Sequence, residues 1–403
     1  MGVGSHGKRV RSIVPPPSPQ VILVSLMVFS MVWQYRNGIS QGTFFQDSQT
    51  SLLDHPHGFH GNHPKPPQHA ISLSELTTTT SINSQNNKNK NIGNRNLQNE
   101  EQAACEAKGF VYIHNIIQAS NNINNSSSTS IRRIPKIVHQ TSKSRCLTKL
   151  FARVTESWRS LDGYEYYLHD DTAMMQLLVS QSDEFPMLHD LVHANCLPHG
   201  TLKADIWRYL VLWKYGGIYA DLDTQPTILF NTTNPIIQDS DDGWFVVEQF
   251  HILSQYVMAM SPYHPLMYYA LYHATLKILA QVDTHRINAA LVTGPHALHY
   301  ALQDFCHDAG IVVERQGTGY KPVKAGWYQG THGRSITVVG RGEYEGEYMT
   351  REMMSLPLKK KQYAKMNMSS FHDDKLQVSG QSCLSAMYQY HHHAMKKKKL
   401  GES

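Results

Sequence analysis

Two aspartates separated by one residue, Asp221 and Asp223, form the most evident candidate metal site in this chain. They end an alternating segment, residues 217–223, in which Tyr219, Asp221 and Asp223 share one face of a predicted strand. Carboxylate oxygens suit Mg²⁺ or Mn²⁺, which often bind to one or two carboxylates together with the phosphate oxygens of a substrate. The pair therefore predicts a cation site for a diphosphate, whose developing charge the cation neutralises as it leaves.

Two other uses of such an acidic pair fit poorly with the residues that follow it. A calcium loop of the EF-hand type needs glycine where Pro226 stands and glutamate where Thr232 stands. A phosphatase-type segment needs threonine or valine where Gln225 stands. The diphosphate site is the interpretation that remains.

The segment before the aspartates, residues 202–215, is predicted to be a helix. Thr201 suits the N-cap position, and Gly216 tolerates the positive φ at which helices end. Its apolar residues recur at i, i+4 and i+7: Ile206, Leu210 and Trp213.

Asp205 and Arg208 share one face of this helix, because they are three residues apart. As a surface ion pair they would contribute little to stability. The helix is otherwise strongly apolar and leads into the aspartates, so we expect the pair to bind the hydroxyl groups of a sugar.

Three further residues are candidates for the same site. His139 and Gln140 end a predicted strand, residues 134–141, where they are expected to contact a nucleotide; the alternative is a turn with satisfied polar groups. His372 is expected to be a third metal ligand from the C-terminal side, although it is one of 24 histidines.

Strand-like and helix-like segments alternate, which predicts an α/β domain with a largely parallel sheet flanked by helices. In such sheets ligands bind beyond the carboxyl ends of the strands, so the candidate residues are expected to converge. The predicted segments are residues 134–141, 147–158, 164–168, 172–180, 202–215, 217–223, 244–248, 256–260, 265–282, 296–305, 311–314 and 336–339.

The termini predict a membrane-anchored protein. Residues 1–20 form a basic cytoplasmic tail and residues 21–35 an uncleaved signal-anchor, with a cleaved signal peptide as the alternative. Residues 36–130 form a polar, low-complexity lumenal stem. The catalytic domain is expected at residues 131–345, and a partly disordered extension at residues 346–403.

Charge and cysteine content exclude two classes of protein. The net charge of +5 arises from two lysine runs with seven positive charges, which leaves −2 (5 − 7) elsewhere, so a nucleic-acid partner is not expected. The five cysteines include no C-x-x-C pair, so a zinc site is not expected either. One or two disulfides are possible in a lumenal protein.

The chain resembles glycosyltransferase family 32, and most of all its initiation-specific α-1,6-mannosyltransferases of the Golgi. The resemblance rests on IPKIVHQT, YEYYLHDD, LKADIWRYLVLWKYGGIYADLD, a YHP turn and TGPHAL, which together span residues 131–305. Two features depart from the family: Ser142 stands where tryptophan is common, and the chain past Gly340 does not match.

The resemblance implies a fold of the GT-A type and a retaining enzyme that uses a nucleotide sugar and Mn²⁺ or Mg²⁺. It implies that Asp221 and Asp223 hold metal and donor, that Asp205 and Arg208 hold the donor sugar, and that His139 and Gln140 lie near the nucleotide.

The resulting hypothesis is a Golgi membrane protein of the single-pass type II class. It would transfer mannose from GDP-mannose to a glycan or glycolipid acceptor. The alternatives are transfer from UDP-galactose or UDP-N-acetylglucosamine, a non-catalytic lumenal glycan-binding protein, and a metal-dependent phosphohydrolase, which Gln225 disfavours.

Overall fold

The computed structural model describes residues 90–116, 132–180, 184–197, 200–227, 230, 235–247, 252–281, 288–307, 323–340, 351–352, 356–368 and 382–400. All of them belong to one compact unit, Pro67–Ser403. The predicted anchor at residues 21–35, the strand at 311–314 and His372 lie outside the described residues. Among the helices that the structure does describe, none has the length and apolar character needed to cross a membrane.

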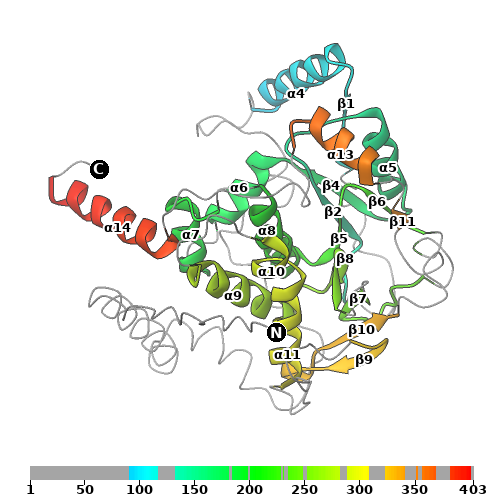
Figure 1. Cartoon of the computed structure of the whole chain (residues 1–403). Helices are drawn as coiled ribbons and strands as arrows, with labels where there is room; N and C mark the ends of the chain where they lie inside the picture. Colours follow the sequence, from blue (N-terminus) through cyan, green and yellow to red (C-terminus); the bar gives the residue numbers. More distant parts are fainter. Residues whose placement is uncertain are drawn as a thin grey trace, which may run out of the picture. The chain divides into compact units, whose positions relative to one another are not determined.

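The helices and strands follow the order drawn in Figure 1. The helices are α4 (Lys90–Ala107), α5 (Lys149–Arg159), α6 (Asp171–Ser180), α7 (Pro186–His193), α8 (Gly200–Tyr215), α9 (Pro265–Leu279), α10 (Ala289–Val292), α11 (Pro295–His307), η2 (Thr331–Gly333), α13 (Leu356–Lys365) and α14 (Cys383–Leu400). The strands are β1 (Val111–Tyr112), β2 (Ile137–Thr141), β3 (Cys146–Leu147), β4 (Glu165–His169), β5 (Gly217–Ala220), β6 (Thr224–Gln225), β7 (Gly243–Val247), β8 (Leu253–Met260), β9 (Gly326–Gln329), β10 (Ser335–Val339) and β11 (Arg351–Glu352).

A seven-stranded sheet in the order β4-β2-β5-β8-β7-β10-β9 forms the centre of the fold. β2 pairs in parallel with β4 and β5, and β10 pairs in parallel with β7. β8 is antiparallel to β5 and β7, and β9 is antiparallel to β10. Five strands therefore run in one direction and two, β8 and β9, in the other. The predicted α/β class with a mostly parallel sheet is confirmed.

Two hydrophobic cores cover the two faces of this sheet. Helices α6 to α11 pack on one face, and α5 packs on the other (Figure 1). Alternation along β5 serves both cores, because Ile218 and Ala220 face the α5 side while Tyr219 faces the α8 side. The strands β2, β5, β7 and β8 are thus buried on both faces, as parallel strands usually are, whereas the edge strand β9 is mostly exposed.

Helix α8 is the helix that leads into β5. It begins at Gly200, so Thr201 lies inside the helix and its predicted N-cap role is wrong. Its predicted end is confirmed: Gly216 has φ +65°, and a Cβ there would lie 2.7 Å from the carbonyl oxygen of Met260. Only glycine fits this backbone without strain.

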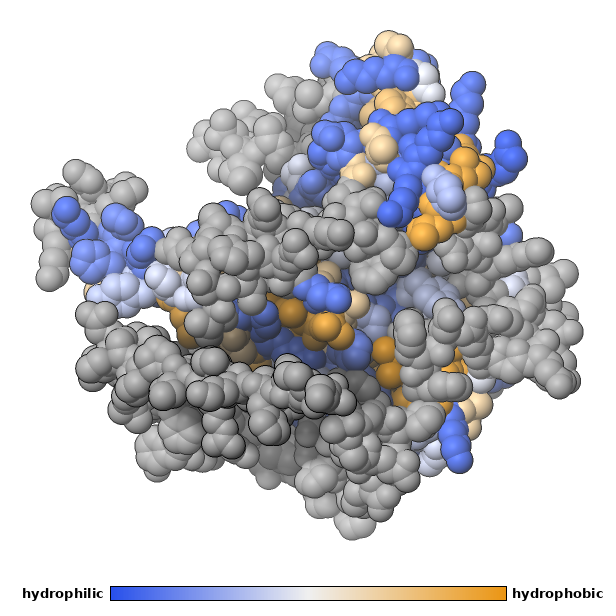
Figure 2. Space-filling model, viewed as in Figure 1, coloured by the Kyte–Doolittle hydropathy of each residue, from blue (hydrophilic) through white to orange (hydrophobic). Residues whose placement is uncertain are grey.

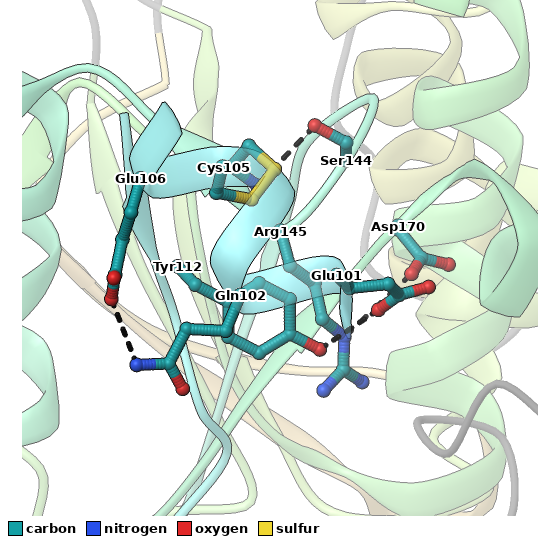
Figure 3. Close-up of a disulfide and its surroundings, with 9 residues drawn as sticks. Glu101, Gln102, Cys105, Glu106, Tyr112, Ser144, Arg145 and Asp170 are labelled. Carbon is teal, nitrogen blue, oxygen red and sulfur yellow. Dashed lines mark hydrogen bonds and ion pairs between the residues drawn. A yellow bond between two sulfur atoms is a disulfide. The ribbon is translucent and has the colours of Figure 1, made fainter. Parts of the chain in front are cut away.

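The folded region begins before residue 131, where the sequence predicts its start. A disulfide joins Cys105 of α4 to Cys146 of β3 (Figure 3). β1 pairs with β3. Cys105 is fully buried beside Tyr112, although α4 is a polar helix. Because a covalent bond and a strand pair hold this segment, its low apolar content does not keep it unfolded.

The C-terminal extension also packs on the domain at three described segments. β11 pairs with β6. Tyr363 of α13 packs against the hydrophobic core on the α5 side of the sheet. A second disulfide, Cys196–Cys383, ties α14 to the chain beyond α7. His391–His393 of α14 are exposed. The coloured part of α14 is mostly hydrophilic (Figure 2). The fifth cysteine, Cys306, is free and buried.

Candidate functional site

The two aspartates lie in a turn, residues 221–223, which we call the DXD turn. β5 ends at Ala220, so the predicted strand to residue 223 is too long. The backbone N–H of Asp221 still donates to the carbonyl oxygen of Tyr256 at 2.8 Å. The carbonyl oxygen of Asp221 accepts from the Thr224 hydroxyl at 2.7 Å. The chain reverses here because the Thr224 backbone N–H also donates to that carbonyl, at 3.1 Å.

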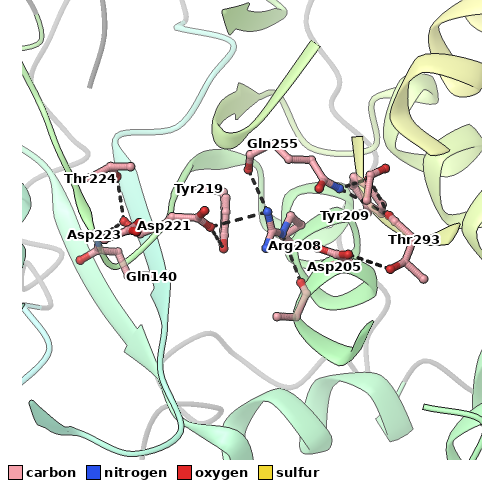
Figure 4. Close-up of polar contacts among 12 residues, drawn as sticks. Gln140, Asp205, Arg208, Tyr209, Tyr219, Asp221, Asp223, Thr224, Gln255 and Thr293 are labelled. Carbon is pink, nitrogen blue, oxygen red and sulfur yellow. Dashed lines mark hydrogen bonds and ion pairs between the residues drawn. The ribbon is translucent and has the colours of Figure 1, made fainter. Parts of the chain in front are cut away.

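Gln140 holds the backbone of this turn. Its Nε2 donates to the carbonyl oxygen of Asp221 at 3.0 Å (Figure 4). Its Oε1 accepts from the Tyr166 hydroxyl at 2.9 Å. Both ends of the side-chain amide are therefore engaged within the protein. In this structure Gln140 is placed to position Asp221 rather than to contact a nucleotide directly.

Arg208 joins α8 to the DXD turn. Its Nη2 lies 3.2 Å from Oδ1 of Asp205, and its Nη1 lies 3.6 Å from Oδ1 of Asp221. Nη1 also donates to the Gln255 carbonyl at 3.0 Å, and the guanidinium carbon lies 4.6 Å from the centre of the Tyr219 ring. The predicted Asp205–Arg208 pair is thus formed, and the structure connects it to the metal-site candidate Asp221.

This network is buried and charged. Asp205 and Arg208 are 4% and 8% exposed. Burial opposes the charge of Arg208, but Tyr219, Asp221 and Asp205 outweigh it and raise the pKa of Arg208 above its usual range. The Thr293 hydroxyl donates to Oδ2 of Asp205 at 2.7 Å, so both oxygens of that carboxylate are engaged. A buried pair with satisfied hydrogen bonds fixes its geometry, which a mobile surface pair does not.

Asp223 has a different neighbour from Asp221. It is 2% exposed, and its Oδ2 forms an ion pair with Nζ of Lys359 on α13. Asp221 is more open, with 30% of its side chain exposed, and its Oδ1 accepts from the Tyr219 hydroxyl at 2.6 Å. The two carboxylates thus lie in one turn but contact different elements.

His139 lies beneath the site. It is fully buried, with Nδ1 3.2 Å from Nε2 of His169 and Nε2 3.0 Å from the carbonyl oxygen of Gly216. Burial lowers its pKa to about 4, against an opposing hydrogen bond to Gly216, so it is neutral at pH 7. Both ring nitrogens contact protein atoms, and His139 therefore braces the end of α8 instead of facing a nucleotide.

The donor set of the DXD turn fits a divalent cation in part. In the described parts of the chain, no group of three or more His, Cys, Asp or Glu side chains could hold a metal ion. The pair Asp221 and Asp223 matches the pattern in which one or two carboxylates bind Mg²⁺ or Mn²⁺ and phosphate oxygens complete the coordination. The buried Asp223 carboxylate is already paired with a cationic group, which shows that its surroundings accept positive charge. The predicted third ligand, His372, lies outside the described residues.

Four residues of the network are not among the predicted site residues. Tyr219 could have been inferred from its shared strand face with Asp221, and Thr293 from the TGPHAL motif. Gln255 contributes a backbone carbonyl, which no side-chain pattern reveals. Lys359 belongs to a lysine run that, in sequence, resembles a solvated tail.

Comparisons with known proteins match the part of the chain that contains the DXD turn. Residues 144–241 match the model of the glycosyltransferase sugar-binding region containing the DXD motif. This part of the chain is therefore similar to that family's sugar-binding region, which supports the resemblance drawn from its motifs.

Three relatives are mannosyltransferases of Schizosaccharomyces pombe. Inositol phosphoceramide mannosyltransferase 3 is 36% identical over 22% of this chain and 24% of its own length. Inositol phosphoceramide mannosyltransferase 1 is 26% identical over 45% of this chain and 54% of its own. The initiation-specific alpha-1,6-mannosyltransferase is 34% identical over 25% of this chain and 26% of its own. The matches thus span between a quarter and about half of these relatives.

Among solved structures, PaToxG glycosyltransferase is similar over 42% of this chain and 68% of its own length. Its sequence identity is 16% and its TM-score is 0.33, which is too low to carry an argument about fold or activity.

Proposed function

We propose that this chain is a retaining mannosyltransferase that uses GDP-mannose and a divalent cation, Mn²⁺ or Mg²⁺, and acts on a glycan or glycolipid acceptor. The observation that carries the proposal is the ion-pair chain from Asp205 through Arg208 to Asp221. It joins a candidate sugar-binding pair to a candidate metal-binding turn inside the region that matches the glycosyltransferase model. The relatives, which are mannosyltransferases by name, support mannose as the sugar.

Each residue of the site has a proposed role. Asp221 and Asp223 would hold the cation, which when bound neutralises the charge of the leaving diphosphate. Arg208 stays charged and fixes Asp205 and Asp221 relative to each other, and Gln140 fixes the backbone of Asp221. Groups that are held in place before the reaction cost no reorganisation in the transition state.

The mechanism proposed is displacement on the front face of the sugar. Oδ1 of Asp205 pairs with Arg208, and Oδ2 accepts from Thr293. A carboxylate with both oxygens engaged is poorly suited to act as a covalent nucleophile. Retention without a covalent intermediate is therefore the hypothesis.

We further propose that the protein resides in the Golgi membrane as a single-pass type II protein, anchored by residues 21–35. The two disulfides, Cys105–Cys146 and Cys196–Cys383, support an oxidising lumenal location for the folded unit.

A donor panel tests the proposed function. The purified chain is incubated with Mn²⁺ and GDP-mannose, UDP-galactose or UDP-N-acetylglucosamine, and release of nucleoside diphosphate is measured with and without EDTA. We expect release from GDP-mannose that EDTA abolishes. Release from a UDP-sugar alone would reassign the donor. Glycan binding that survives EDTA, with no turnover of any donor, would show that the chain is a glycan-binding protein and not an enzyme.

A further inference from the structure

The C-terminal segment 351–368 returns to the DXD turn at two points. β11 pairs with β6, the strand that directly follows Asp223, with Glu352 opposite Thr224. α13 then places Lys359 against Asp223. The matched glycosyltransferase region ends at residue 241, so these contacts come from a part of the chain outside it.

The position of Lys359 is set by packing along α13. The Tyr363 ring lies 4.9 Å from the Phe151 ring of α5, and Gln362 is buried. Beyond the helix, Lys143 donates to the Asn367 carbonyl at 3.0 Å, just past the end of β2. The Lys359 side chain is 19% exposed, so it is less enclosed than the Asp223 carboxylate that it contacts, which is 3% exposed.

The charges of the site indicate what the ammonium group of Lys359 contributes. Three carboxylates (Asp205, Asp221 and Asp223) face two cationic side chains (Arg208 and Lys359), so the net charge is −1 (−3 + 2). A divalent cation changes the sum to +1, which attracts an anionic diphosphate. Without Lys359 the same sum is zero, and this attraction is lost.

We propose that Lys359 is a further donor-binding residue, whose ammonium group moves from Asp223 to the diphosphate oxygens of the donor when a divalent cation occupies the DXD turn. The inference rests on the proposed function. Two cations at one carboxylate repel each other, so Lys359 and the metal compete for Asp223. Lysine suits the exchange because its flexible stem carries a point charge with three donors. Once displaced from Asp223, the ammonium group can donate to the diphosphate oxygens.

Two binding measurements with opposite expected signs test this exchange. Mn²⁺ alone, and then GDP in saturating Mn²⁺, are titrated into the full chain by calorimetry. In Lys359→Met we expect Mn²⁺ to bind several-fold more tightly, because its competitor is gone. GDP should bind about tenfold more weakly or worse, because one charge-assisted hydrogen bond is lost. A purely structural role for Lys359 would weaken both.

Two further variants serve as controls. Lys361→Met, at an exposed position of the same helix, should leave both affinities unchanged. Lys359→Arg keeps the charge and should retain GDP affinity within about threefold, which separates loss of charge from loss of fold. Equal GDP affinity in Lys359→Met and the unaltered chain would overturn the role of Lys359 but leave the proposed function unaffected. If the unaltered chain bound neither GDP nor UDP in Mn²⁺, the proposed function would be overturned as well.

Discussion

Arg208 of α8 and Asp221 of the DXD turn lie 3.6 Å apart, measured from Nη1 to Oδ1. Helix α8 and strand β5 are joined only by Gly216, whose positive φ reverses the chain and returns it alongside the helix. The same guanidinium pairs with Asp205, three residues earlier. The central helix therefore both packs the core and fixes the more open carboxylate of the candidate metal site.

The Asp205–Arg208 pair should show strong coupling in a double-mutant cycle. Arg208→Met leaves a buried carboxylate without its cation, and we expect a loss of about 3–5 kcal/mol in the free energy of unfolding. Asp205→Leu combined with Arg208→Met should lose clearly less than the sum of the two single variants. Urea unfolding of the four proteins measures the coupling, and additive losses would show that the two charges act independently.

Gln140 should act on the DXD turn through its two hydrogen bonds. Gln140→Met loses both bonds without adding charge beside the metal-site candidate, whereas Tyr166→Phe loses only the bond to the Gln140 Oε1. We expect Gln140→Met to weaken Mn²⁺ affinity and Tyr166→Phe to lower stability by about 1 kcal/mol without changing that affinity. Metal titration and urea unfolding of both variants separate the effects. Unchanged Mn²⁺ affinity in Gln140→Met would remove Gln140 from the site.

Buried histidines should make the fold sensitive to acid. Burial lowers the pKa of His139 to about 4, and burial together with Arg334 lowers that of His264 to about 3, from an ordinary 6.5. The unfolded chain therefore binds more protons between pH 6.5 and 4, and stability falls as pH falls through this window. For His139 alone the loss is on the order of 3 kcal/mol.

Unfolding free energies measured at pH 7 and pH 4.5 check this dependence. His139→Gln should reduce the difference between the two pH values, even if it lowers stability at both. A pH dependence as steep as that of the unaltered chain would mean that His139 is not buried in neutral form.

The disulfide Cys105–Cys146 should hold the N-terminal segment on the domain. It closes a separation of 41 residues, so its removal is expected to cost about 3–4 kcal/mol. In the Cys105→Ala, Cys146→Ala variant, amide exchange should rise in α4 and β1. The buried free thiol at Cys306 offers a control, because Cys306→Ala leaves both disulfides intact. Equal exchange in α4 with and without the disulfide would contradict the tether.

Local pattern predicts much of this fold and part of the site. The strand and helix alternation predicts β2, α5, β4, α6 and α8 to within a few residues, because their core faces repeat at regular spacing. The i, i+3 spacing places Asp205 and Arg208 together on a helix, and the glycine stop returns the chain to Asp221.

Contacts distant in sequence could not be predicted in this way. Alternation does not show where pairing ends, so the DXD turn resembles a strand until the Thr224 hydrogen bonds are seen. The burial of His139 depends on Gly216 and His169, which lie in other elements. Lys359 reaches Asp223 only because α13 packs against α5, and its lysine run gives no periodic signal of that contact.

The most direct test of the account is turnover of GDP-mannose in Mn²⁺ by the unaltered chain and by Asp223→Ala. Asp162→Asn, at an exposed position of the α5–β4 loop, serves as the matched control, and circular dichroism checks that each variant is folded. We predict release of GDP by the unaltered chain and by Asp162→Asn, and a loss of at least about 100-fold in Asp223→Ala. Equal release by Asp223→Ala and the unaltered chain would contradict the assignment of the DXD turn to the reaction.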